Sequence, residues 1–438
     1  MTPSRLLPLF IALGTAFSTA ASAQSLVDLY VSARGFDASY QSAQSQYTAT
    51  LAKADQSKAL MLPTVGLNAG VSRTHLDNSV APTRTYGAQQ ATLSASQPLY
   101  RPANRAAYEQ GLRLVDLAQA QLLAADQDLI VRVSQAYFDV LASRDTLNFV
   151  KAQKAAVAEQ LASAKRNFEV GTSTITDSRE AQARFDLSNA QEIAAENDLR
   201  IKKLALDQLV GKADAQPQVL AQPLSLPALV PNDVTTWVQQ AEATHPVIQQ
   251  SQIALDIAQL ETKKAQAGHQ PTVDLTAGYN VTQNDGSASL ATDFRTHAAT
   301  VGVSFNMPLF AGFAIQNRVK ETLALEDKAR SDLEGARRTV SQFTRTAFFG
   351  VQSGQGQVKA LEAAEASSQS ALEANQLGYQ VGVRINIDVL NAQSQLFQTK
   401  RDLAKARYDV LVGGLKLRQA NGTLKADDLQ AVNALLAQ

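Results

Sequence analysis

Two short segments carry the residues whose types and spacing could do chemistry, and each segment echoes the other. They lie at 168–180 and 379–391, and an offset of 211 residues places Asp177 on Asp388. In both, a Val-Gly pair precedes the aspartate by six or seven residues. Glycine tolerates the left-handed conformation that ends a helix, and Thr, Asn or Asp can cap the next helix. The pattern therefore predicts two helical hairpins, each with its tip at one of these segments.

The charged residues of the tips can have a purely structural role. Asp177 and Asp388 can simply cap the helices that follow them, and Arg384 can be a solvated surface charge. A carboxylate that caps a helix can at the same time make a second interaction. A structural role for these residues therefore does not exclude a functional one.

Other kinds of site find little support. The four histidines, at positions 75, 245, 269 and 297, are scattered and lack zinc-ligand spacing. Gly211-Lys212 lacks the preceding glycine and following Ser or Thr of a phosphate loop. The chain has no cysteine, and its 40 basic residues balance 40 acidic ones, which argues against binding nucleic acid. We expect no enzyme, no catalytic residue, no cofactor and no metal.

Residues 1–23 resemble a secretory signal peptide. Arg5 precedes an apolar run at 6–17, and Ala21-Ser22-Ala23 matches a small-residue cleavage site. The run is shorter than the ~20 apolar residues needed to span a membrane. We therefore expect a secreted mature chain that begins at Gln24.

The rest of the chain reads as two similar halves. Period-2 alternation predicts strand hairpins, and long proline-free stretches predict helices. The first half, 24–210, has a helix at 26–61, a hairpin at 63–98, a long helix at 105–170 and a helix at 176–210. The second half, 233–420, has a helix at 233–267, a hairpin at 271–310, a long helix at 313–381 and a helix at 386–420. A connector with four prolines, 211–232, separates the halves.

An internal duplication and coiled-coil spacing support this division. The run Pro271-Thr272-Val273 matches Pro63-Thr64-Val65 at an offset of 208 residues. Seven-residue spacing joins Val389, Leu396, Leu403, Val410 and Leu417, and a 4/3 rhythm joins Leu325, Ala329, Leu333, Ala336, Val340, Phe343 and Ala347. The second rhythm reaches Gly350 and Gly354, where close helix approach, a bend or simple surface tolerance are all possible.

The predicted elements imply an elongated molecule that needs partners. A helix of about 66 residues would be roughly 100 Å long, the length of two shorter helices end to end. We expect the long helices to lie beside stacked short pairs, with the strands at the opposite end from the tips. Four strands cannot close a membrane barrel, so several chains must pool their strands, or the strands lie in water.

These features resemble the TolC-type outer-membrane channels of multidrug efflux and type I secretion. The resemblance covers essentially the whole mature chain and includes the Gly-His-Gln-Pro-Thr-Val-Asp-Leu-Thr-Ala run at 268–277 and the tip pattern at 378–390. It implies a mainly α fold with membrane β structure. Three chains, with four strands each, would form a twelve-stranded barrel in the outer membrane that continues into a helical coiled-coil tunnel through the periplasm. A belt of irregular structure would comprise 211–232 and 421–438.

The resemblance also implies roles for tip residues. Thr176, Asp177, Tyr379 and Arg384 correspond to a latch that holds the tunnel closed. Asp388 corresponds to an acidic ring inside the closed end, where tripled carboxylates would attract cations and repel anions. The second ring position, an aspartate in the family's pattern, is Asn391 here, so the expected ring charge is halved.

The Val-Gly turns complete the implied site. Val170, Gly171, Val381 and Gly382 correspond to the places where a periplasmic adaptor would dock. The resemblance implies a passive exit duct for small molecules or secreted proteins, with outer membrane lipid around it and an adaptor and an inner-membrane transporter as partners. The alternative from a different class is a soluble periplasmic coiled-coil adaptor or scaffold.

Overall fold

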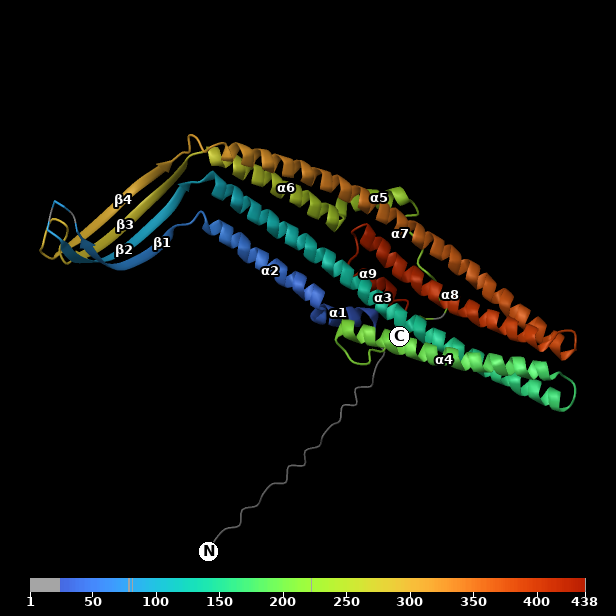
Figure 1. The fold of residues 1–438 in the computed structure, drawn as a ribbon. Helices are drawn as coiled ribbons and strands as arrows, with labels where there is room; N and C mark the ends of the chain where they lie inside the picture. Colours follow the sequence, from blue (N-terminus) through green and yellow to red (C-terminus); the bar gives the residue numbers. More distant parts are fainter. Residues whose placement is uncertain (1–23, 78, 81, 222, 438) are drawn as a thin grey trace, which may run out of the picture.

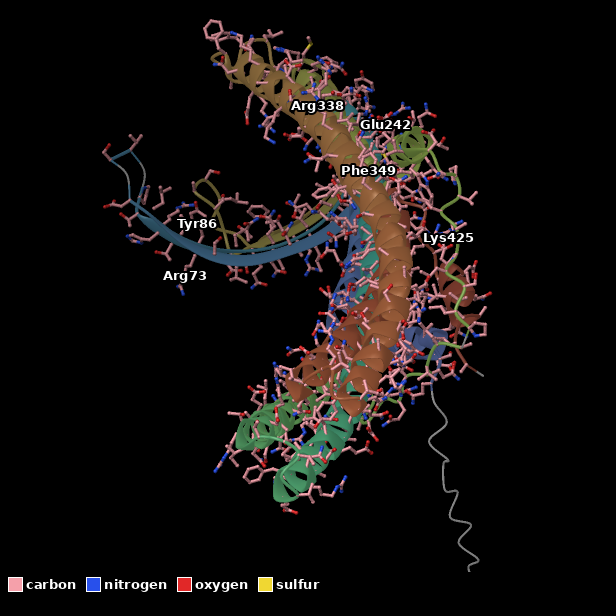
Figure 2. The ribbon with its side chains drawn as sticks, turned by 90° about the vertical axis from the view of Figure 1, so that its right-hand side faces the viewer. Arg73, Tyr86, Glu242, Arg338, Phe349 and Lys425 are labelled. Carbon is pink, nitrogen blue, oxygen red and sulfur yellow. The ribbon has the colours of Figure 1, made fainter. Side chains whose placement is uncertain are left out.

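The computed structural model describes residues 24–77, 79–80, 82–221 and 223–437 as one long rod. Figure 1 shows a β-sheet at one end, two helical tips at the other, and parallel rods of helix between them. The expected signal peptide, 1–23, lies outside the described residues. Figure 2 shows that the helices curve and that the sheet bends away from them.

The sheet contains four antiparallel strands in chain order. These are β1 (Thr64–Leu76), β2 (Arg84–Tyr100), β3 (Thr272–Asn284) and β4 (Phe294–Asn306). The two hairpins lie side by side, because β2 of the first half pairs with β3 of the second. Their outer strands, β1 and β4, each have one edge with no strand beside it among the described residues. The sheet is therefore open at both edges.

The register of the strands gives the sheet one apolar face and one small polar face. Leu67 lies opposite Leu93, and Leu93 opposite Tyr279, so residues of the same kind share a face. The apolar face carries Val65, Leu67, Val71, Leu93, Leu275, Tyr279, Val301, Val303 and Phe305, all exposed to the extent of 39% or more. The other face carries Asn68, Ser72, Thr92, Ser94, Thr276, Asn280, Thr300 and Ser304. This is the division of a strand that faces lipid on one side and water on the other.

Two long helices and four short ones form the rods. The long helices are α3 (Pro102–Glu169) and α7 (Ala314–Gln380), and the short ones are α2 (Ala38–Ala59), α4 (Ile175–Val210), α6 (Pro246–Gln266) and α8 (Asn386–Ala420). The pair α2 and α4 packs along α3, and the pair α6 and α8 packs along α7. Because α3 also contacts α6 and α8, it lies in the middle of the layer, with α2 and α4 at one edge and α7 at the other.

Two of the expected helices are each divided in the structure. The helix expected at 26–61 is α1 (Leu26–Phe36) followed by α2, because Asp37 leaves the helical conformation and caps α2 by accepting from the Tyr40 amide at 2.8 Å. The helix expected at 233–267 is α5 (Val234–Thr244) followed by α6, because Pro246 has no amide hydrogen to continue a helix. The expectation of single helices over these ranges was wrong.

The seven-residue pattern of α8 marks its buried side, whereas the pattern of α7 is buried only in part. Val389, Leu396, Leu403, Val410 and Leu417 are all buried. On α7, Leu333 and Val340 are buried, but Leu325 and Phe343 are exposed. Of the two glycines in question, Gly354 is the one in close approach, since a β-carbon there would lie 3.0 Å from Val410. No atom lies within 4 Å of such a carbon at Gly350.

The largest apolar core lies halfway along the rod, where the short helices of each pair meet. It joins α1, the middle of α3 and the end of α8 to the connector and to α9 (Asp428–Asn433). Short β-bridges tie the connector to both ends of the described chain, Gln24 with Pro217 and Leu220 with Leu436. Beside this core, the partly buried Asp145 carboxylate accepts from the Tyr408 hydroxyl at 2.6 Å, and desolvation raises the pKa of this carboxyl. The core therefore fixes the α1–α4 half to the α8–α9 segment.

A charged pair lies where the sheet meets the helices. The Arg101 guanidinium, just before α3, donates to both carboxylate oxygens of Asp274 on β3, at 2.7 and 2.6 Å. This bidentate geometry is among the stronger polar contacts in proteins.

None of the helices in the described ranges is long and apolar enough to cross a membrane.

We predict that Gly422→Ala destabilises the protein more than Gly171→Ala. Both glycines have a positive φ, near +78° and +77°, and an alanine in that conformation costs about 1–2 kcal/mol. At Gly422 a β-carbon would also lie 2.5 Å from the His245 Cα, whereas at Gly171 there is open space. Thermal unfolding followed by circular dichroism should give the lower melting temperature for Gly422→Ala. Equal melting temperatures would contradict the close approach of 421–424 to the α5–α6 junction.

Candidate gate site at the helical tips

The two tips have the same backbone structure. After α3, Gly171 has φ +77° and its amide donates to the Phe168 carbonyl at 3.0 Å. After α7, Gly382 has φ +77° and its amide donates to the Tyr379 carbonyl at 3.1 Å. This left-handed glycine is the feature that the Val-Gly pairs predict. The duplicated sequence therefore folds into a duplicated turn.

The helices that leave the two tips begin differently. At α4, the Thr174 hydroxyl accepts from the Asp177 amide at 3.3 Å, and the Asp177 carboxylate accepts from the Thr174 amide at 3.1 Å, which completes a capping box. At α8, the corresponding N-cap is Ile385, which has no side-chain cap bond. Asp388 therefore lies in the first turn of α8 without a capping partner of this kind, and its negative charge stabilises the helix dipole there.

The four expected latch residues do not all meet within one chain. Tyr379 reaches the other tip, where its hydroxyl accepts from the Asn167 side chain at 3.3 Å. Arg384, in the turn before α8, instead forms an ion pair with Asp388 in the first turn of α8 at 3.7 Å. The Asp177 carboxylate is engaged as a cap, and the Thr176 hydroxyl lies 2.5 Å from that of Thr174. Among the described contacts of this chain, none joins Arg384 to Asp177.

The two expected ring residues have different surroundings. Asp388 is one-third exposed at its side chain. Asn391 points to the other hairpin, where its side-chain oxygen accepts from Arg184 of α4 at 2.8 Å. The Asn391 amide therefore makes a contact between α8 and α4.

The expected docking residues lie on the outermost surface. Val170 and Val381 are exposed to 73% and 65%, and no atom lies within 4 Å of a β-carbon built at Gly171 or Gly382. Gly378, in contrast, is closely packed, because a β-carbon there would lie 2.7 Å from the Arg384 side chain. The absence of a side chain at Gly378 lets Arg384 lie across the end of α7.

Sequence reasoning missed the polar residues that join the hairpins. Asn386, the first residue of α8, is fully buried and bonds to both Gln160 of α3 and the Asp177 carbonyl of α4. Arg184 and Asn167 were also missed. One clue was available for Asn386, since it is a polar residue between Ile385 and Ile387, and its counterpart 211 residues earlier is Ile175.

Within the described ranges, no group of three or more His, Cys, Asp or Glu side chains is placed to hold a metal ion. The tips instead combine exposed turns, a few charges and hydrogen bonds between hairpins. This arrangement can hold two helix pairs together or release them.

Comparisons with known proteins agree with this architecture. A family model described as outer membrane efflux protein matches residues 29–212 and 237–423. Outer membrane protein TolC of Vibrio cholerae is 34% identical over 438 residues, which cover 98% of each chain. Alkaline protease secretion protein AprF of Pseudomonas aeruginosa is 29% identical, over 94% of this chain and 88% of its own.

Solved structures share the fold. The outer membrane protein VceC of Vibrio cholerae aligns with a TM-score of 0.76 at 20% identity, over 91% of this chain and 96% of its own. The open state of the Neisseria gonorrhoeae MtrE outer membrane channel aligns with a TM-score of 0.71 at 19% identity, over 92% and 90%.

We predict that Thr174→Ala loosens the first turn of α4 without affecting α8. The substitution removes the hydroxyl that caps the helix, a loss of about 1 kcal/mol. Hydrogen exchange followed by mass spectrometry should show faster exchange for amides 175–178 and unchanged exchange for 386–389. Ser173→Ala is the matched control, since the Ser173 hydroxyl makes only a 3.5 Å contact with a carbonyl. Unchanged exchange in 175–178 would show that the capping box does not hold this turn.

Proposed function

The chain belongs to the outer membrane efflux protein family, and we propose that three copies form one duct, closed at its periplasmic tips until partner proteins open it. The family places the chain in the outer membrane of a Gram-negative bacterium as an exit channel, and the resemblance drawn from the sequence is confirmed. The alternative of a soluble adaptor or scaffold was wrong, because the family match spans both halves of the chain.

The open sheet is the observation that carries the proposed assembly. On its apolar face, Val71 is 83% exposed and Val301 is 80% exposed. Such exposure of apolar side chains is unfavourable in water and favourable in lipid. In lipid, the free backbone groups along β1 and β4 would each cost several kcal/mol. Pairing β4 of one copy with β1 of the next removes that cost. Three copies would close a barrel of twelve strands.

The edges of the helical layer support the same arrangement. Large apolar side chains remain exposed on α7 and α4, namely Leu323, Leu325, Phe343, Phe349, Leu377, Leu187, Ile193, Ile201 and Leu204. Figure 2 shows Phe349 and Arg338 on the surface of α7, with Glu242 of α5 nearby. We infer that α7 of one copy packs against α2 and α4 of the next, so that the helices close a tunnel together with the barrel.

This arrangement gives the expected latch residues a place between chains. The tip of α7 and α8 would lie beside the α4 tip of the neighbouring copy, so Arg384 could reach Thr176 and Asp177 there. Exposed pairs of this kind are worth about 0–1 kcal/mol each. Such links would keep the tunnel closed yet yield when an adaptor docks at Val170, Gly171, Val381 and Gly382.

The same arrangement would define the lumen, and the names of the relatives indicate the kinds of cargo. Asp388 from three copies would form an acidic ring, without a second ring at Asn391, which bonds to Arg184. AprF is named as an alkaline protease secretion protein, and the matched family as efflux proteins. We propose that small molecules, secreted proteins or both pass through, and that an inner-membrane transporter chooses between them.

We predict that the purified protein is a trimer that requires detergent and conducts ions in planar bilayers. Mass photometry or native mass spectrometry gives the number of copies, and single-channel recording gives the conductance. Extraction of a monomer without detergent, or a trimer that never conducts, would contradict the proposed duct.

We also predict that Arg384→Ser with Tyr379→Phe raises the conductance of the closed channel. The change removes the guanidinium and the hydroxyl available for links between hairpins and between copies. Arg105→Ser is the matched control, because Arg105, like Arg384, pairs with a carboxylate four residues further along the chain, but it lies at the far end of α3. Equal conductance for the double variant and the control would remove these residues from the latch.

A further inference from the structure

We propose that Asn386 is a buried polar lock that holds the α7–α8 tip against the α3–α4 tip, and that opening the duct requires breaking it. This inference rests on the proposed gate and names a residue that controls it. Neither Asn386 nor its partner Gln160 is among the expected latch, ring or docking residues.

The lock is made by one side chain that bonds to two helices of the other hairpin. The Asn386 side-chain oxygen accepts a hydrogen bond from the Gln160 side-chain amide of α3. Its side-chain nitrogen donates to the Asp177 carbonyl of α4 at 3.3 Å. Since Asn386 is the first residue of α8, these bonds fix the start of α8 to both helices of its neighbour.

Burial distinguishes Asn386 from the exposed polar contact between the tips. The Asn386 residue has no exposed surface and its two bonds are partly buried, as is the bond between Asn167 and Tyr379, whereas the bond between Arg184 and Asn391 is exposed. A buried amide that loses its partners pays a desolvation cost, whereas an exposed one exchanges them for water. The Asn386 bonds therefore favour the closed arrangement more strongly than the exposed contacts do.

The surroundings of Asn386 are suited to sliding once the lock is broken. Beside it, Leu390 packs with Val157, Leu161, Ala164 and Ala181, with Phe185 and Ile387 at the margin. Apolar contacts of this kind have no fixed geometry, so they resist separation without defining a register. The two hydrogen bonds supply the register.

The duplication shows that the lock is particular to one half. The counterpart of Asn386 is Ile175, which is 48% exposed, and the counterpart of Gln160 is Ala371, which is also exposed. The start of α4 is held by its own capping box, while α8 has an isoleucine at its N-cap. The structure thus anchors α4 locally and anchors α8 through its neighbour.

The test is single-channel recording of the full-length Asn386→Leu trimer in planar bilayers. Leucine is similar in size and suits the apolar cluster, but it leaves the Gln160 amide and the Asp177 carbonyl without this partner. We expect the ratio of open to closed time to rise roughly a hundredfold, because about one net hydrogen bond is lost in each of the three chains that open together. Entry of a bulky antibiotic into cells carrying the variant should rise in parallel.

Matched variants separate the lock from general loosening. Asn375→Leu removes an amide whose described side-chain bond, 2.8 Å to the Ala371 carbonyl, lies within α7. We expect it to behave as the wild type. Gln160→Leu alone should raise opening, and the double variant should open less than the product of the two single effects.

Each outcome decides between defined alternatives. If the wild type conducts and Asn386→Leu opens no more than Asn375→Leu while its trimer melts normally, the lock is excluded and the duct stands. Independent effects of the Gln160 and Asn386 variants would also exclude it. A wild-type trimer that never conducts would instead overturn the proposed function.

Discussion

Unpaired backbone groups along β1 and β4 are the constraint on which the remaining architecture depends. Register puts most of the large apolar residues of the four strands on one face, so that face belongs in hydrocarbon. Hydrocarbon offers no hydrogen-bond partners, and each free amide or carbonyl there is costly. A single chain cannot satisfy these groups with the strands it has. The need for neighbouring copies therefore arises in the sheet, and it also determines how the helices below the sheet are arranged.

The helical part is packed strongly in its middle and weakly at its tips. Its largest apolar core lies midway along the rods and joins α1, α3, α8 and α9 to the connector. At the tips the apolar cluster is small, and polar bonds between hairpins define how the helices sit. Strong packing far from the tips allows the tips themselves to be held weakly. The proposed gate would then move at the tips without loosening the rod.

Local patterns in the sequence were enough to predict most elements of the fold. Alternation marked the strands, the lack of proline marked the long helices, and Val-Gly marked both turns. The breaks at Asp37 and at Pro246 were missed, although Pro246 is a helix breaker that the sequence displays.

The candidate site was predictable only in part. The tips, their glycines and the cap at Asp177 follow from neighbouring residues. The partners of Arg384, Asn391 and Tyr379 depend on how α3, α4 and α8 pack, and no short stretch of sequence records that packing. A polar residue between two isoleucines hinted at Asn386, but its partners lie 209 and 226 positions away.

The unequal starts of α4 and α8 have a consequence for how the repeat works. The internal repeat supplies two tips with the same backbone turn. One copy has a self-sufficient helix start in Thr174 and Asp177, whereas the other has Ile385 as its N-cap and is held by its sister hairpin. The two copies therefore differ in that one helix start is anchored locally and the other depends on its neighbour. A symmetric repeat acquired a division of labour without any new fold.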